Sequence, residues 1–176
     1  MPSGRVPATA PAPLRLERLA ARHPVSAFTC GDAAIDDYLR HHALAEQETG
    51  LSRVTVAVDA AEGAVVGFYT LSPLSIRLDE GLLRAVGLDA VPYPMVGGYL
   101  LGRLGVDVGR AGQGLGAALV VTALDAAAQA STETGGVFLA VDPKDDRLVG
   151  WYERLGFARL DARRRRVVRR LEQADA

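Results

Sequence analysis

Four glycines fall within eight residues, at positions 109, 112, 114 and 116, between an apolar segment and a long alanine-rich segment. Glycine lets the backbone come close to a ligand, and the first free N–H groups of a helix point at an anion along with the positive end of the helix dipole. The spacing therefore predicts a phosphate cradle between a strand at 99–108 and a helix that begins at Gly114. Arg110 lies in the same loop and could add a side-chain charge.

The glycine loop allows two other interpretations. A glycine-rich turn can connect a strand to a helix without binding a ligand. Gly112, Gly114 and Ala117 also fit the dinucleotide-binding pattern G-x-G-x-x-G/A that follows a strand. A nicotinamide enzyme needs several further strand–helix units after that turn, whereas only about 60 residues follow it here and nearly 100 precede it. The rest of the sequence must decide between a cradle and a plain turn.

Length and composition predict a single globular domain. The chain has 176 residues, of which 49% are hydrophobic and 23% charged, and its formal net charge of −1 gives no sign of a polyanionic partner. Cys30 is the only cysteine, which excludes an internal disulfide and a cysteine zinc site. We therefore expect a cytoplasmic protein without a metal. No apolar run approaches the ~18 residues of a membrane span, so we also expect no membrane.

Hydrophobic periodicity and turn residues predict a mixed α/β (α+β) fold. We expect a disordered tail at 1–13, one domain at 14–171 and a tail at 172–176. The expected strands lie at 14–19, 51–58, 64–72, 99–108, 136–141, 157–160 and 166–171, with a loop at 91–98. The expected helices run from Asp32 to about Thr49, over 79–86, from Gly114 to about Ala130, and over 145–155. Gly67 predicts a bulge or a close backbone approach, and the third helix should bury Leu115, Leu119, Thr122 and Ala126.

This order of elements, with the glycine loop and the motif WYERLGF at 151–157, resembles the GNAT family of acetyl-CoA-dependent N-acetyltransferases over about residues 14–161. The resemblance implies a mixed central sheet of about six or seven strands with helices on both faces, and acetyl-CoA as co-substrate. The family's pyrophosphate motif, Gln/Arg-x-x-Gly-x-Gly/Ala, falls on 111–116. Ala111 departs from its first position, where Arg110 could substitute. By this resemblance the cofactor-binding residues are Leu104, Gly105, Val106, Arg110, Ala111, Gly112, Gln113, Gly114, Leu115, Gly116 and Asp145.

Several further motifs resemble the GNAT toxins of bacterial toxin–antitoxin pairs. They are FTCGD at 28–32, IDDYL at 35–39, GLSR at 50–53, GFYTLS at 67–72, PYP at 92–94 and LLGRLGVD at 100–107. The resemblance implies acetylation of the amine of aminoacyl-tRNA, a block of translation, a ribbon-helix-helix antitoxin as partner, and a homodimer. Asp145 stands where these toxins have aspartate, whereas Gly105 stands where alanine is usual.

Acetyl transfer to an amine needs a neutral amine, donors for the developing oxyanion and a proton for the leaving thiolate. By the family's geometry, backbone N–H groups around Val106 supply the donors and Tyr152, a phenol with a pKa of about 10, supplies the proton. A packing role for Tyr152 is the alternative. His23, His41 and His42 are not placed to act as a base. A site without a base favours an α-amine, of pKa about 7.7–8.0, over a lysine amine of pKa about 10.4.

Six arginines occupy eight positions between 163 and 170. Arg163, Arg164, Arg165 and Arg166 could contact tRNA phosphates, or they could form a solvated edge strand or an antitoxin-docking surface. Arg53 and Arg103 could contact an acceptor phosphate or pair with carboxylates. The leading hypothesis is a toxin that acetylates charged tRNA. The alternatives are an acetyltransferase for a small amine or a protein N-terminus, and a catalytically silent acyl-CoA-binding module.

Overall fold

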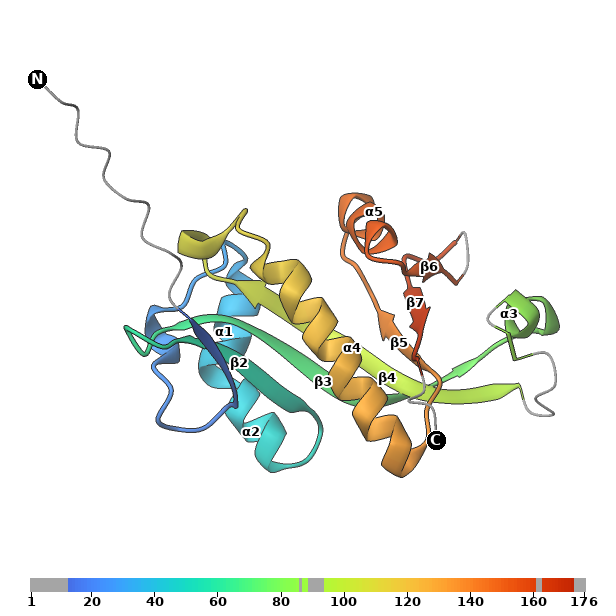
Figure 1. The fold of residues 1–176 in the computed structure, drawn as a ribbon, viewed down its shortest axis with the longest axis horizontal. Coiled ribbons are helices and arrows are strands. Elements are labelled where there is room, and N and C mark those ends of the chain that lie inside the picture. Colours follow the sequence, from blue (N-terminus) through green and yellow to red (C-terminus); the bar gives the residue numbers. More distant parts are fainter. Residues whose placement is uncertain (1–12, 86, 89–93, 161–162, 173–176) are drawn as a thin grey trace, which may run out of the picture.

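A seven-stranded sheet forms the centre of the fold (Figure 1), with the strand order β1-β2-β3-β4-β5-β7-β6. The computed structural model describes residues 13–85, 87–88, 94–160 and 163–172. Only the β4–β5 pair is parallel, and the other pairs are antiparallel. The strands are β1 (Leu14–Arg18), β2 (Arg53–Asp59), β3 (Val65–Arg77), β4 (Met95–Val106), β5 (Phe138–Val141), β6 (Ala158–Arg159) and β7 (Val167–Arg170).

Helices cover both faces of this sheet, as the sequence predicts. They are η1 (Val25–Ala27), α1 (Ala33–His41), α2 (Ala43–Glu48), α3 (Glu80–Ala85), η2 (Val108–Arg110), α4 (Leu115–Thr134) and α5 (Asp146–Arg154). Successive residues of β3 point to opposite faces, so Phe68 packs with the α1 core while Tyr69 packs with the α4 and α5 core. The mixed sheet and its two covered faces confirm the expected fold class.

The expected helix from Asp32 to Thr49 is two helices. Asp32 caps α1 as predicted, because its side chain accepts hydrogen bonds from the N–H groups of Ala34 and Ile35. The chain then leaves helical geometry at His42, with φ −122°, and α2 starts at the next residue. The continuous apolar periodicity hid this break, because both helices bury residues against the same face of β2.

The two central strands are longer than expected. β3 continues to Arg77 and β4 begins at Met95, so the loop predicted at 91–98 is wrong over 95–98, while residues 91–93 lie outside the described part. Gly97 and Gly98, interpreted as loop residues, lie inside β4. A Cβ at Gly98 would come within 2.6 Å of Phe138, so this glycine lets β4 approach β5.

The helix α4 packs across β3 and β4 (Figure 1) through residues spaced by four, Leu115, Leu119, Ala123 and Ala127. The stripe expected over Thr122 and Ala126 is wrong, since both are only half-buried. Of the described helices, α4 is long and apolar enough to cross a membrane by length and composition alone, which corrects the expectation that no run reaches that length. In this fold, however, its buried side chains belong to the core of the sheet.

Gly67 brings α4 close to the sheet. A Cβ at Gly67 would lie 2.9 Å from Cδ1 of Leu119. The β2–β3 register also shifts between Ala57 and Val58, where Ala57 faces Gly67. The bulge that the sequence predicted at this glycine is therefore present, while the closest contact is with a side chain of α4 and not with another backbone.

Candidate active site

The strand β4 is bulged where it separates from β5. Tyr69 pairs with Leu104 and Leu71 pairs with Leu101, so two residues of β4 face Thr70 alone. The hydroxyl of Thr70 accepts a hydrogen bond of 3.0 Å from the N–H of Arg103. The last β4–β5 pair joins Leu101 to Val141. Beyond the bulge, β4 therefore continues to Val106 with one free edge, on which no described strand pairs.

Backbone donors point outward along this free edge. The N–H groups of Arg103 and Asp107 donate toward β3, at 3.0 Å to Thr70 Oγ1 and 2.9 Å to the carbonyl of Val66. Successive N–H groups of a strand alternate between its two sides, so those of Leu104 and Val106 point to the free edge. Fixed N–H groups of this kind can bind an oxyanion or the amides of a ligand arm.

The contacts on the face of the sheet that packs against α1 explain why position 105 is glycine. A Cβ at Gly105 would lie 2.9 Å from Phe68, 3.1 Å from Ile35 and 3.2 Å from Phe28. The rings of Phe28 and Phe68 form an edge-to-face pair with centroids 5.5 Å apart. This aromatic pair occupies the space that a methyl group would need, so the departure from alanine is a packing adjustment behind the free edge.

The glycine loop ends in a helix start without a cap. Gly112 and Gly114 have φ values of +73° and +82°, and a Cβ at either would have no neighbour within 4 Å. Gly114 is the N-cap of α4 and provides no side-chain acceptor, and the first turn holds no acidic residue. The first helical hydrogen bond runs from the N–H of Ala118 to the carbonyl of Gly114. The preceding N–H groups of α4 are therefore available to an anion.

Arg110 has a carboxylate partner. Its guanidinium forms an ion pair with Asp59, whose side chain is 1% exposed. Asp59 also accepts hydrogen bonds from the N–H groups of Glu62 and Ala61, and these bonds, with the charge of Arg110, hold the pKa of its carboxyl below the usual value. Arg110 thus anchors the loop to the β2–β3 turn, and a phosphate contact through its other N–H groups stays a prediction.

The helix α5 meets the start of α4 and the end of β4. A Cβ at Gly116 would lie 3.6 Å from the ring of Trp151 and 3.7 Å from Cγ2 of Val106. Asp145, expected among the cofactor-binding residues, is the N-cap of α5 and accepts a hydrogen bond of 2.8 Å from the N–H of Leu148. Its carboxylate therefore caps the N-terminus of α5.

Tyr152 is a buried residue of α5. It belongs to the same apolar cluster as Leu101 and Val141, the last β4–β5 pair, and its ring packs edge-to-face on Trp151 and Phe157 at centroid distances of 4.8 and 5.4 Å. Burial raises the pKa of Tyr152 to about 12, so its phenol is neutral at physiological pH and able to donate. Packing and proton donation are therefore compatible roles for this side chain.

Arg53 and Arg103 have other partners than carboxylates. The guanidinium of Arg103 lies over the ring of Tyr38, 3.7 Å from its centroid, and Arg53 donates to the carbonyl of Gln47. Within the described residues neither forms an ion pair with a carboxylate, so that alternative is wrong. Tyr38 itself donates to Glu46, at 2.8 Å. Arg103 is one of the two residues that form the bulge of β4.

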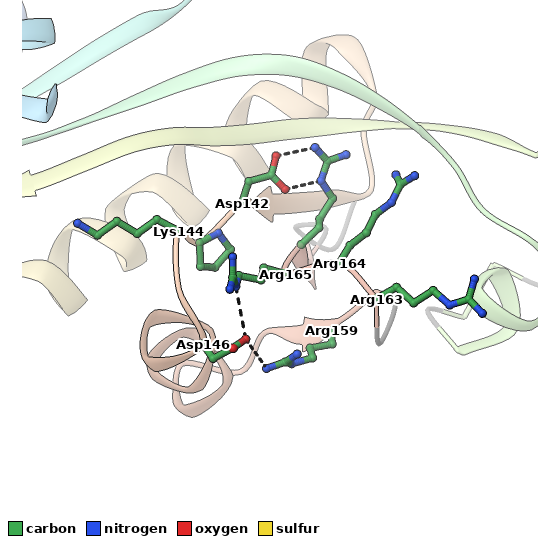
Figure 2. A pocket seen from close by; sticks show the side chains of 9 residues that line it. Asp142, Lys144, Asp146, Arg159, Arg163, Arg164 and Arg165 are labelled. Atoms are coloured by element: carbon green, nitrogen blue, oxygen red, sulfur yellow. Dashed lines mark hydrogen bonds and ion pairs between the residues drawn. The ribbon is translucent and has the colours of Figure 1, made fainter.

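The arginine-rich segment lines a polar cavity of about 720 Å³, which we name the arginine basin (Figure 2). Its lining consists of Asp142, Pro143, Lys144, Asp146, Arg159, Arg163, Arg164, Arg165 and Arg166. The interpretation of this segment as an edge strand is wrong, because residues 163–166 precede β7, and β7 lies between β5 and β6.

Two features of the site escaped sequence reasoning. Asp59 lies between the predicted strands at 51–58 and 64–72, and nothing local indicates that its partner lies 51 positions away. The β4 bulge opposite Thr70 depends on pairing between strands, which no single segment encodes. In contrast, the glycine loop and WYERLGF are local patterns, and the structure brings Gly116, Trp151 and Val106 together.

Comparison with known proteins agrees with this geometry. The family model described as the acetyltransferase (GNAT) family matches residues 23–157. The tRNA-acetylating toxin of Mycobacterium tuberculosis (strain ATCC 25618 / H37Rv) is 33% identical over 140 residues, which cover 80% of this chain and 81% of that protein.

Solved structures show the same fold. AtaT complexed with acetyl-methionyl-tRNAfMet matches with a TM-score of 0.81 and 24% identity, over 90% of this chain and 95% of the other. A tyrosine-to-phenylalanine mutant of KacT matches with a TM-score of 0.81 and 25% identity over the same shares. A similar mutant of the AtaT toxin, bound to the C-terminus of the antitoxin AtaR, has a TM-score of 0.76 and 25% identity, over 90% and 93%. With its free β4 edge, uncapped α4 and matching family model, this chain belongs to the GNAT family of acetyltransferases.

Proposed function

We propose that this chain transfers the acetyl group of acetyl-CoA to the α-amine of an aminoacyl-tRNA and so acts as a toxin that blocks translation in the cytoplasm. The observation that carries the proposal is the free edge of β4 beside the uncapped start of α4, where Val106 and Trp151, the neighbour of Tyr152, both lie close to Gly116. The identity of 33% to a tRNA-acetylating toxin supports the choice of acceptor.

The residues of the cradle fit acetyl-CoA, which supplies an acetyl thioester when bound. The open N–H groups at the start of α4 would hold its pyrophosphate, and the positive φ of Gly112 and Gly114 keeps the space above them clear of side chains. The outward N–H groups of Leu104 and Val106 would bind its amide arm and the charge that develops on the acetyl oxygen.

Tyr152 would act as a proton relay. The amine nitrogen bonds to the acetyl carbon, the carbon–sulfur bond breaks, and the phenol donates its proton to sulfur. A phenol of pKa about 12 that protonates a thiolate of pKa about 8.5 gives up roughly 5 kcal/mol if it stays ionised. Tyr152 must therefore regain a proton from the nitrogen, which sheds one as the amide forms. This relay needs no separate base.

Arg103 favours a neutral acceptor amine. Arg103 lies in the bulge of β4, and its guanidinium is fixed over Tyr38 without a carboxylate partner in the described part of the chain. A nearby positive charge lowers the pKa of an ammonium group, because it disfavours the charged form. Together with the low intrinsic pKa of an α-amine, this would increase the share of amine that is ready to react. Arg53, exposed at the start of β2, stays a proposed contact to the acceptor phosphates.

The acceptor is tested by comparing charged with uncharged tRNA. The assay measures acetyl transferred from labelled acetyl-CoA and free thiol released. We expect transfer to charged tRNA and none to uncharged tRNA. Transfer to small amines or protein N-termini instead would support the alternative acetyltransferase. Absence of thiol release with every acceptor would leave only an acyl-CoA-binding module.

We further propose that a small ribbon-helix-helix antitoxin silences the enzyme and that the chain forms a homodimer. The similarity to a toxin solved with the C-terminus of its antitoxin supports the first proposal. Co-expression with the protein encoded next to this chain should yield a stable complex that no longer acetylates charged tRNA. Light scattering of the isolated chain measures the dimer, and a mass of one chain would contradict it.

A further inference from the structure

Lys144 is the only lysine of the chain, and it lies where β4 and β5 separate. Val141 ends β5 and forms the last pair with β4, and Lys144 follows in the loop that leads to α5. The Lys144 side chain points away from the arginines of the arginine basin (Figure 2). Its Nζ donates to Oδ2 of Asp32, at 2.6 Å. The backbone of Lys144 therefore belongs to the β5 side of the separation, while its ammonium group is held elsewhere.

The partner of Lys144 lies on the β4 side. Asp32 is the N-cap of α1, and Ile35, in the first turn of this helix, lies 3.1 Å from the position that a Cβ at Gly105 would take. Gly105 belongs to the free stretch of β4, whose outward N–H groups we propose as donors to the acetyl oxygen. The side chain of Lys144 thus runs from the β5 loop to the helix behind the free edge, across the place where the two strands separate.

The amine of Lys144 is accessible but mostly charged. Its side chain is 62% exposed. The hydrogen bond and charge of Asp32 raise the pKa of Lys144, Asp145 raises it further, and Arg147 opposes both. A lysine of ordinary pKa is neutral in about one molecule in 2,500 at pH 7, whereas an α-amine is neutral in about one in ten. Lys144 is therefore a slow acceptor that an α-amine outcompetes.

We propose that Lys144 is a self-acetylation site, to which the chain transfers the acetyl group of its own bound acetyl-CoA when a faster acceptor is absent. The proposal rests on the use of acetyl-CoA in the proposed function and not on tRNA as acceptor. The ammonium group first loses a proton to solvent. The neutral Nζ then bonds to the acetyl carbon, the carbon–sulfur bond breaks, and the phenol of Tyr152 donates its proton to sulfur. The new amide nitrogen returns a proton to Tyr152, which balances the step.

Acetylation of Lys144 would break its ion pair with Asp32. An acetylated lysine carries no charge. The pKa of Asp32 is lowered, and the hydrogen bond from Lys144 is the largest cause, so this pKa should rise when the lysine is acetylated. The start of α1 and the β5–α5 loop would then no longer be joined by this pair. The modification would therefore alter both sides of the free edge at once.

The first test places a second lysine in the same chain. Arg15→Lys on β1 provides the reference, because the Arg15 side chain is 61% exposed and also pairs with a carboxylate, that of Glu17. The strands β2 and β3 separate β1 from β4. This variant is incubated with isotope-labelled acetyl-CoA, and peptide mass spectrometry follows acetylation at positions 144 and 15. The rate constant at Lys144 should not depend on the protein concentration, because the transfer occurs within one chain.

A chemical reagent controls for the intrinsic reactivity of the two amines. The acetyl ester of N-hydroxysuccinimide acetylates exposed lysines without a cofactor site. The ratio of the rate at Lys144 to the rate at position 15 should be about tenfold or more higher with acetyl-CoA than with this ester, because only the bound cofactor is held beside Lys144. Tyr152→Phe should slow the reaction of Lys144 with acetyl-CoA and leave its reaction with the ester unchanged.

A second readout needs no cofactor. The carboxyl pKa of Asp32 is measured by NMR titration in the wild type, in Lys144→Gln, which resembles acetyl-lysine, and in Lys144→Arg, which keeps the charge. We expect a higher pKa in Lys144→Gln and in the wild type acetylated by the ester, and a low pKa in Lys144→Arg. An Asp32 pKa that stays low in Lys144→Gln would overturn the release of α1 by acetylation.

The outcomes separate this proposal from the proposed function. Equal rate ratios with acetyl-CoA and with the ester would overturn self-acetylation. A rate constant at Lys144 that grows with protein concentration would indicate transfer between chains and overturn the placement beside the chain's own cofactor. Acetylation of charged tRNA by a chain whose Lys144 stays unmodified without tRNA would overturn this proposal alone. Self-acetylation without acetylation of any charged tRNA would support it and overturn the proposed acceptor.

Discussion

The helices α4 and α5 start differently, although both starts lie beside the same free edge of β4. The start of α4 at Gly114 has no side-chain cap and no acidic residue in its first turn. The start of α5 is capped by Asp145 and has Asp146 in its first turn. A capping carboxylate accepts hydrogen bonds from the first N–H groups and compensates the helix dipole. At an uncapped start, the N–H groups and the positive end of the dipole are available to a ligand.

Because their starts differ, the two helices have different roles: α4 binds the anion of the ligand, and α5 holds the side chain that donates a proton. The uncapped start of α4 provides N–H groups for an anion, and the capped helix α5 holds Tyr152 in the core. The contact of Trp151 with the region of Gly116 fixes one helix against the other. A carboxylate at the start of α4 would repel a phosphate, and an open start in α5 would let the helix fray and displace its tyrosine. Variants of each helix should therefore change different constants.

The largest effect on the reaction rate is expected from a substitution of Tyr152 on α5. Tyr152→Phe removes one hydroxyl and should lower kcat by roughly 10²–10⁴, the usual worth of a positioned proton donor, with little change in acetyl-CoA affinity. Single-turnover acetylation of charged tRNA measures it. Tyr69→Phe is the matched control, since Tyr69 is also buried in the same cluster. Equal rates for Tyr152→Phe and the wild type would leave Tyr152 with packing alone and direct the search for an acid to water.

A substitution at the uncapped start of α4 should change the affinity for acetyl-CoA. Gly114→Val places a side chain where φ is +82° and where the phosphates approach, so the acetyl-CoA dissociation constant should rise about tenfold or more. Gly50→Val is a matched control, because φ is +81° there and the surrounding space is also open, but no cradle is present. Calorimetry on both folded variants measures the constant. Unchanged affinity in Gly114→Val would place the cofactor elsewhere.

A smaller effect is expected at Asp59, which pairs with Arg110 and so holds the glycine loop in place. Asp59→Asn weakens the pair with Arg110, so KM for acetyl-CoA should rise severalfold with kcat nearly constant. The Asp59 pKa is lowered in the folded chain, so its carboxylate contributes stability above the ordinary pKa, and this contribution is lost as pH falls through the folded value. Unfolding followed from pH 7 into the acid range should be less pH-dependent in the variant. A fall in kcat alone would contradict the positioning role.

Features set by neighbouring residues could be predicted from the sequence. The glycine spacing placed the start of α4, and Asp32 and Asp145 marked the starts of α1 and α5, because capping and turn geometry depend on a few adjacent residues. The same local logic failed at His42, where a helix break leaves the apolar periodicity intact.

Features set by distant pairing could not be predicted. The bulge of β4 depends on the register with β3, and the Arg110–Asp59 pair joins two turns across the sheet. The sequence shows charged residues but not their partners, so it does not reveal the Arg110–Asp59 pair and leaves a phosphate contact and a carboxylate pair open for Arg103. Tertiary contacts instead placed Arg103 over Tyr38.

The smallest expected effect concerns Asp145, where capping and cofactor binding predict different results. Its carboxylate accepts the N–H of Leu148, so Asp145→Ala should cost about 0.5–2 kcal/mol of stability, while Asp145→Asn, which also caps well, should cost less. For a chain of this size, 1 kcal/mol corresponds to a Tm shift of about 2–4 °C. Calorimetric unfolding measures the Tm, and acetyl-CoA titration of the same samples measures affinity. A cap that only orders α5 leaves the affinity of Asp145→Asn near that of the wild type. A large loss of affinity in Asp145→Asn with an unshifted Tm would instead make Asp145 a cofactor ligand, and the closed start of α5 would then take part in binding as the open start of α4 does.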